Sequence, residues 1–109
     1  MLSWLFQRIT AAFLLIGLIV HFWVLHFAIQ RPVTLQKVVD RLTAPGWILF
    51  DVLLLGFAIY HGLNGLWQIY LDVNPTKRVK KYVGWIFVLL GIATFAYGCS
   101  ILASFLSVK

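Results

Sequence analysis

A histidine stands in the middle of the long apolar stretch that covers residues 51–72. Four residues follow it at offsets of three, four, seven and eleven, so the set is His61, Asn64, Gly65, Gln68 and Asp72. These offsets place all five residues on one face of an α-helix. Because polar groups are costly in hydrocarbon, we expect this face to lie against protein, a cofactor or a water-lined site.

A second histidine, His21, lies in an earlier apolar stretch and shares a helix face with Thr10 and Gly17. Gly17 stands one turn before His21, and Gly65 stands one turn after His61, so a flat ring could approach the backbone beside each imidazole. Neutral imidazoles, one on each side of the ring, suit the iron of haem b. We therefore predict His61 and His21 as axial haem ligands, with Arg8 near a haem propionate or a quinone-site partner.

Each of these assignments has a structural alternative. Arg8 equally fits a side chain that extends to lipid headgroups, and His21 could be a buried, hydrogen-bonded structural histidine. At about 1.5 Å per residue, His61 lies about 16 Å outward of Asp72 and His21 about 20 Å outward of Arg8. This difference in depth favours two haems over one only weakly, because helix tilt can produce it.

The composition explains what must position these histidines. The chain has 109 residues, of which 62% are hydrophobic and 11% charged, and its mean hydropathy is +0.96. Three apolar stretches, residues 4–29, 46–71 and 82–107, each exceed the roughly 20 residues that span a bilayer core. We predict an all-α polytopic membrane protein, with residues 1–109 forming a single transmembrane domain. Its helices are expected at about residues 4–29, 46–72 and 79–107, within a larger helical bundle.

The charged residues lie mostly in the two loops. Between the second and third stretches stand Lys77, Arg78, Lys80 and Lys81, which predict an inside loop, an inside N-terminus and an outside C-terminus. The net charge of +6 then suits anionic lipid, and we expect no nucleic-acid partner. The first loop is expected to hold a short amphipathic surface helix at residues 33–42.

Asp51 needs a partner in the membrane, and the available residues are Arg31, Arg41 and His26. His26 lies about 140° round the helix from His21 and otherwise fits an interfacial histidine. In the third stretch Gly84, Gly91 and Gly98 recur every seven residues, which is typical of close helix packing.

No catalytic residue is predicted, because the sequence lacks a P-loop, HExxH, a paired carboxylate site and a serine or cysteine triad. Cys99 is the only cysteine, so it can form no intrachain disulfide. The first apolar stretch is too long for a cleaved signal, and we expect it to be retained.

Two segments resemble a known family. One is SWLFQRIT, followed by His21; the other is WILFDVLLLGFAIYHGLNGLWQIYLD, with His61 eleven residues before Asp72. Across nearly the whole chain they resemble the D-type hydrophobic membrane-anchor (cytochrome b) subunit of succinate dehydrogenase, also called complex II or succinate:quinone oxidoreductase. Within that family, the W-x-x-x-D-x-L-L-L and H-G-x-N-G segments resemble actinobacterial members most closely.

The resemblance implies a non-catalytic electron-transfer and anchoring subunit in the cytoplasmic (inner) membrane. Its partners would be a flavoprotein, an iron–sulfur protein and a second membrane subunit, and quinone would accept the electrons at the inner surface. Two-haem members of the family imply that His61 binds the inner haem b and His21 the outer one. The alternatives are a fumarate reductase subunit and a non-redox assembly, interaction or transporter subunit.

For the quinone site, the resemblance implies Asp72 and a tyrosine directly after it. Val73 occupies that position here, so Tyr70 or Tyr82 would have to replace the tyrosine.

Overall fold

The structure, a computed structural model, describes residues 2–28 and 31–108. Every secondary-structure element in these residues is a helix. Helix α1 (Leu2–Trp23) continues into a π-helical turn, η1 (Val24–Ala28), and is followed by a short helix, α2 (Leu35–Thr43). Two long helices complete the chain, α3 (Pro45–Leu71) and α4 (Lys77–Val108). Three segments are long and apolar enough to cross a membrane: Leu2–Ala28, Pro45–Leu71 and Lys77–Ser107. The all-α prediction with three transmembrane helices is confirmed.

The ends of these segments follow local signals. Pro45 begins α3 at its first turn, and α3 ends at Leu71, where the backbone N–H of Asp72 donates to the carbonyls of Ile69 and Tyr70. The first residue of α1 and both ends of α3 and α4 lie within two residues of the predicted positions. The predicted end of the first helix, residue 29, lies outside the described residues.

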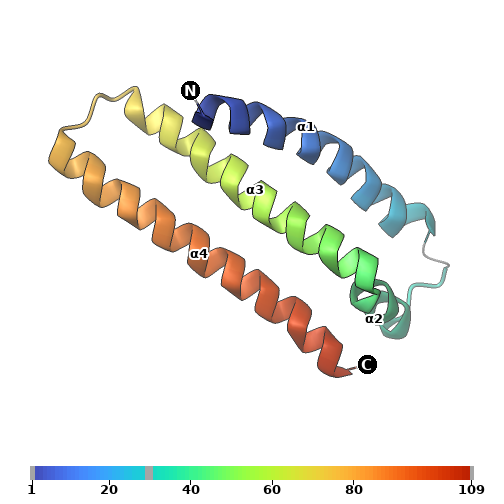
Figure 1. Cartoon of the computed structure of the whole chain (residues 1–109). Helices are drawn as coiled ribbons and strands as arrows, with labels where there is room; N and C mark the ends of the chain where they lie inside the picture. The colour runs from blue at the N-terminus through green and yellow to red at the C-terminus, as the bar shows by residue number, and fades with distance from the viewer. Residues whose placement is uncertain (1, 29–30, 109) are drawn as a thin grey trace.

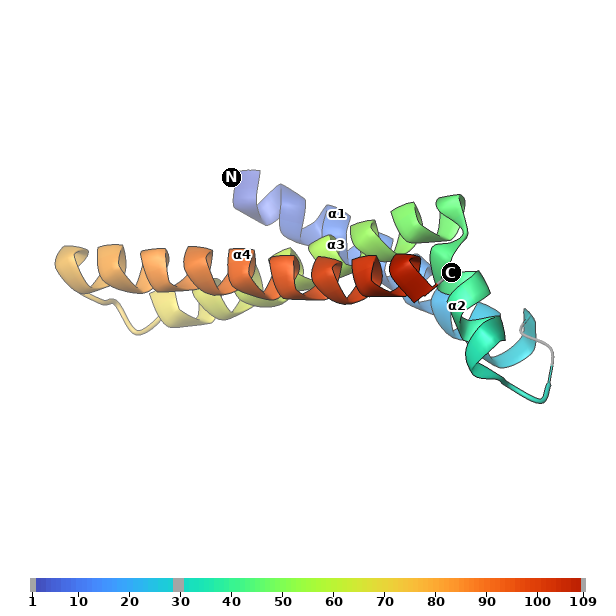
Figure 2. The same ribbon diagram turned by 90° about the horizontal axis from the view of Figure 1, so that it is seen from below.

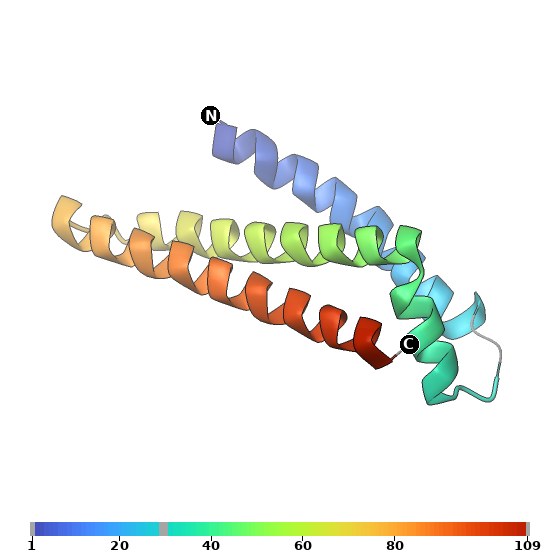
Figure 3. The ribbon, with the colours of Figure 1, turned by 60° about the horizontal axis from the view of Figure 1, so that its bottom comes forward.

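Helix α3 is the middle member of a single layer (Figures 1 and 2). It packs antiparallel against α1 on one side and against α4 on the other, and within the described residues α1 does not contact α4. Figure 3 shows that α1 and α4 are both inclined to α3, and that α4 diverges from α3 toward its C-terminal end. A three-helix layer has two open faces, and only Val24, Val39 and Leu54 are buried among the described hydrophobic residues. These faces suit contact with lipid or with further membrane helices.

Helix α2 lies at the end of the layer where α3 begins and α4 ends (Figure 1). The Thr34 hydroxyl accepts a hydrogen bond from the Lys37 backbone N–H at 3.3 Å and caps its start. One face of α2 is buried, including Val39 at 1% exposure, while Asp40 is exposed. The short helix predicted at residues 33–42 therefore forms at Leu35–Thr43, and its location at the membrane surface stays a prediction.

The three glycines of α4 all face α3. A Cβ atom at Gly84 would lie 3.4 Å from Trp67, and one at Gly91 would lie 3.0 Å from the Leu63 side chain. Gly98 lies similarly against Leu55. The predicted role of this glycine repeat in helix packing is confirmed.

This packing supports a prediction about stability. A Gly91→Leu substitution should overpack the α3–α4 contact and cost about 1–3 kcal/mol, because its Cβ alone would already press on Leu63. The measurement is the thermal denaturation midpoint of the purified membrane protein, and Ala93→Leu is the control because Ala93 is exposed on the same helix. Equal shifts for the two variants would contradict the packing role of Gly91.

Candidate functional site

Polar side chains from α1 and α3 meet along the contact between these helices. We call them the polar seam: Ser3, Gln7, Thr10, His61, Asn64 and Gln68. Asn64 Nδ2 donates to Gln7 Oε1 at 2.8 Å, and Gln7 Nε2 donates to the His61 carbonyl at 3.2 Å. Near the N-terminus, Gln68 Nε2 lies 3.4 Å from Ser3 Oγ. Of the predicted polar face, His61, Asn64 and Gln68 therefore contact α1, which is one of the three expected surroundings, whereas Asp72 is exposed.

The order of these contacts follows from the antiparallel packing. Ser3, Gln7 and Thr10 recur at helical spacing on α1 and meet Gln68, Asn64 and His61 in reverse order. Each polar group in an apolar environment thereby gains a partner on the other helix. The seam therefore fixes the register of α1 on α3, and with it the level at which the His61 ring is held.

The contact with Thr10 selects one tautomer of a neutral His61 ring. Its side-chain oxygen lies 3.1 Å from His61 Nδ1 and 2.7 Å from the Phe6 carbonyl, and Thr10 is only 2% exposed. A hydroxyl carries one proton, and the shorter contact to the carbonyl can only use that proton as donor. At Nδ1 the hydroxyl must then accept, so Nδ1 carries the imidazole proton and Nε2 keeps its lone pair.

This arrangement is the one that a metal-binding imidazole requires. A histidine that binds a metal usually donates its second ring N–H to an oxygen, which fixes the tautomer and the orientation of the ring. Among the described residues, no hydrogen bond engages His61 Nε2, and the His61 side chain is half-buried rather than enclosed. The residues present therefore fit a haem iron bound by Nε2.

The glycines next to the histidines have packing roles in the structure. A Cβ atom at Gly17 would lie 2.9 Å from Leu54 Cδ1, and one at Gly65 would lie 3.2 Å from Gln7 Nε2. Both glycines therefore allow α1 and α3 to approach closely, and their predicted place beside a haem ring stays a prediction. Gly62, next to His61, has no atom within 4 Å of its Cβ position, so the backbone is open on that side.

A second polar cluster lies toward the other end of the α1–α3 contact. Arg41 of α2 forms an ion pair with Asp51 of α3, and their side chains are 6% and 9% exposed. The Arg41 guanidinium also lies 4.7 Å from the centre of the Trp47 ring. Arg41 was one of the three predicted partners of Asp51. The other two predicted partners, Arg31 and His26, are exposed.

His21 faces the same carboxylate, with its Nδ1 atom 3.9 Å from Asp51 Oδ1. Four buried polar atoms of this cluster have no hydrogen-bond partner among the described residues: His21 Nδ1, Asp51 Oδ1, Arg41 Nε and Arg41 Nη2. Buried polar groups are normally paired, so the cluster retains capacity to bind a further polar group. An imidazole beside a carboxylate is also a common arrangement for a metal ligand.

The two histidines lie at different levels of the layer. His21 lies beside Asp51, which precedes His61 by ten residues on α3, a separation of about 15 Å at the helical rise. Two axial ligands of one haem must face each other across a flat ring. The structure therefore does not bring His21 and His61 together as the ligand pair of one haem.

The other predicted site residues lie near the end where α3 leads into α4. Arg8 is exposed and lies over the Trp4 ring at 4.3 Å, and Asp72 is exposed at the C-cap of α3. The buried Tyr70 hydroxyl has no hydrogen-bond partner among the described residues, whereas Tyr82 is 59% exposed at the start of α4. No contact that the structure shows joins these four residues into one site.

Sequence reasoning placed Thr10 on the histidine face of the first helix but did not identify it as the partner of His61. The available signal was the matching spacing of Ser3, Gln7 and Thr10 with Gln68, Asn64 and His61, read in opposite directions. The burial of Arg41 was also missed. At 100° per residue Arg41 lies next to Lys37 and about 100° from Leu42, so the pattern of the short amphipathic helix did not indicate its burial.

Comparison with known proteins gives consistent matches over most of the chain. A model of the family described as "Succinate dehydrogenase/Fumarate reductase transmembrane subunit" matches residues 1–98. A Thermoplasma acidophilum protein named "Succinate dehydrogenase hydrophobic membrane anchor subunit" is 34% identical over 93 residues, covering 84% of this chain and 76% of the relative. An Archaeoglobus fulgidus protein of the same name is 33% identical over 103 residues, covering 94% and 88%. Both relatives are archaeal, so they give no support to the expected similarity to actinobacterial anchors of the D type.

Proposed function

Since the chain belongs to the succinate dehydrogenase/fumarate reductase transmembrane subunit family, we propose that it is a membrane-anchor cytochrome b subunit of succinate:quinone oxidoreductase. The observation that carries the haem assignment is the contact between Thr10 Oγ1 and His61 Nδ1 at 3.1 Å. It leaves the lone pair of Nε2 available in the middle of a membrane-spanning helix. When bound, haem b supplies a one-electron carrier between iron–sulfur clusters and quinone.

In this proposal the residues of the polar seam hold and orient the iron ligand. Thr10 accepts the Nδ1–H hydrogen bond of His61, which prevents rotation of the ring and increases the electron density at Nε2. The bond from Gln7 to the His61 carbonyl and the bond from Asn64 to Gln7 fix the backbone at that level. The ligand is thus positioned before the haem binds.

We assign a second, outer haem to His21. Its ring faces Asp51, and Arg41 beside it has two buried, unpartnered nitrogen atoms that could meet a propionate. Because His21 and His61 lie about 15 Å apart along the layer, each iron would need its opposite ligand from another chain. The proposed complex therefore includes a second membrane subunit, together with the iron–sulfur and flavoprotein subunits.

At the other end of the layer we assign Asp72, with Tyr70 or Tyr82, to a quinone contact, and Arg8 to an inner-haem propionate or to lipid headgroups. The buried, unpartnered Tyr70 hydroxyl supports Tyr70 over the exposed Tyr82. The basic residues of the predicted loop, Lys77, Arg78, Lys80 and Lys81, lie in the first turns of α4, and they support an inside orientation of this end in the cytoplasmic membrane. The same parts would serve fumarate reduction, since the direction depends on the quinone potential and on the other subunits.

The haem content of the purified complex tests this proposal. We expect two b-type haems per copy of this chain, measured from the pyridine haemochrome spectrum against the flavin content. A single haem would contradict the assignment of His21 and leave it as part of a structural cluster with Asp51 and Arg41. A complex without haem would overturn the cytochrome function and favour the non-redox assembly or interaction subunit.

A further inference from the structure

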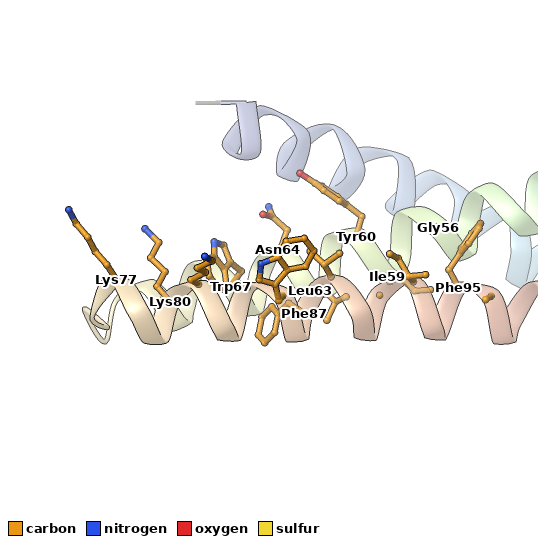
Figure 4. A pocket seen from close by; sticks show the side chains of 17 residues that line it. Gly56, Ile59, Tyr60, Leu63, Asn64, Trp67, Lys77, Lys80, Phe87 and Phe95 are labelled. Carbon is orange, nitrogen blue, oxygen red and sulfur yellow. The ribbon is translucent and has the colours of Figure 1, made fainter.

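An apolar groove of about 1050 Å³ runs between α3 and α4 on one open face of the layer (Figure 4). Its walls carry Leu63 and Trp67 from α3, and Phe87, Val88 and Phe95 from α4. The groove contains neither histidine and none of the polar-seam residues except Asn64. It is therefore separate from the haem ligands proposed above.

One end of the groove is positively charged. Lys77, Lys80 and Lys81 line it there, and Figure 4 shows Lys77 and Lys80 extending to the same side as Asn64. No ion pair joins these three lysines to an acidic side chain within the part of the chain that the structure describes. Arg78, in the same turn of α4, does not line the groove. Three cations without a protein counter-charge thus converge at the mouth of an apolar channel.

The groove is long enough to cover one leaflet of a bilayer from the headgroup level inward. From Lys81 to Phe95 is fourteen residues along α4, or about 21 Å at the helical rise. This exceeds half of the roughly 30 Å hydrocarbon core. Trp67 and Trp85 lie in the groove close to the lysines, and tryptophan is typical of the headgroup level of a membrane. The groove therefore runs from the headgroups past the middle of the membrane.

We propose that this groove binds an anionic phospholipid from the leaflet beside the α3–α4 loop. Its phosphate contacts Lys77, Lys80 and Lys81, and an acyl chain lies along Leu63, Val88 and Phe95. The lysines select this class of ligand, since a zwitterionic lipid gains little from three cations and the head of a quinone is uncharged. The inference extends the proposed function to a lipid site and depends on no haem assignment.

The first test measures lipid selectivity with the purified complex in nanodiscs or by native mass spectrometry, using phosphatidylglycerol and phosphatidylcholine as probes. At about 1 kcal/mol per lysine near the surface, a Lys80→Gln/Lys81→Gln variant should bind phosphatidylglycerol roughly thirtyfold more weakly. Arg78→Gln is the matched control and should retain the affinity within a few fold. Equal weakening by Arg78→Gln, or equal binding of the two lipids by the unmodified complex, would overturn the proposal.

The second test identifies the occupant of the groove. A photo-crosslinking amino acid at residue 88, inside the groove, should capture phosphatidylglycerol in preference to phosphatidylcholine in the intact complex. One at residue 89, which is 62% exposed outside the groove, is the control and should capture both lipids alike. Transfer of the label at residue 88 to another protein subunit would overturn the proposal. That result would leave the haem assignments untouched, because the histidines lie elsewhere.

Discussion

A His61→Ala variant is expected to lose one of the two b-type haems from the purified complex while the complex still assembles. The substitution removes the Nε2 lone pair that the contact with Thr10 leaves available. Alanine has no atom that can bind iron, so the loss should be complete at this site rather than partial. The measurement is haem per flavin, together with the reduced absorption bands, and His21→Ala should remove the other haem.

The controls for this result come from the same chain. His26→Ala also removes a membrane-level histidine, but His26 is exposed and its ring lies near Phe22, so haem content should stay at two. Retention of both haems in His61→Ala would reject His61 as a ligand. Loss of haem in all three histidine variants would indicate failed assembly, and flavin and subunit content would reveal it.

Thr10 provides a finer test of the positioning argument. A Thr10→Val substitution keeps the volume but removes the oxygen that accepts from Nδ1, so the haem should remain bound with altered properties. Loss of that hydrogen bond lowers the basicity of the ligand, and we expect a more positive midpoint potential. Thr10→Ser should restore the potential, whereas an unchanged potential in Thr10→Val would contradict the role of this contact.

The sequence allowed prediction of the three spans and of the polar face on α3. Both depend on local patterns, namely the length of an apolar stretch and the spacing of polar residues along one helix. The glycine repeat of α4 was also readable, because small residues at a constant spacing mark a packing face whatever the partner helix.

The pairing between helices could not be predicted in the same way. A threonine within a helix commonly hydrogen-bonds a backbone carbonyl of the same helix. The presence of a threonine at position 10 therefore does not reveal that its side chain also contacts His61. That contact depends on the register of α1 against α3, which several polar residues set together. The choice among Arg31, Arg41 and His26 for Asp51 likewise needed the placement of α2.

The groove between α3 and α4 could not be predicted from the sequence for a different reason. The basic residues from Lys77 to Lys81 carry a topology signal, and this signal does not show which of their side chains share one face with the apolar residues. The structure separates Arg78 from Lys77, Lys80 and Lys81, which line the groove. The same residues can therefore indicate both the orientation of the chain and a lipid site.

The second large effect concerns stability. An Arg41→Met variant is expected to destabilise the complex by about 3–5 kcal/mol, because it leaves the Asp51 carboxylate buried without its cation. Both side chains are more than nine-tenths buried, so water cannot replace the lost partner easily. The thermal denaturation midpoint should fall clearly, and protease sensitivity should rise first in the segment of α2, which the ion pair holds against α3.

A double variant distinguishes the cost of the unpaired charge from the loss of arginine packing on Trp47. Arg41→Met combined with Asp51→Leu removes both charges, and replacing a buried ion pair by apolar residues is often neutral or stabilising. We therefore expect the double variant to recover most of the stability. Arg31→Met is the control, because Arg31 is exposed in the segment before α2, and it should change the denaturation midpoint little. If the double variant were no more stable than Arg41→Met alone, the guanidinium would act mainly through its contact with the Trp47 ring, and the buried carboxylate would not be the source of the loss.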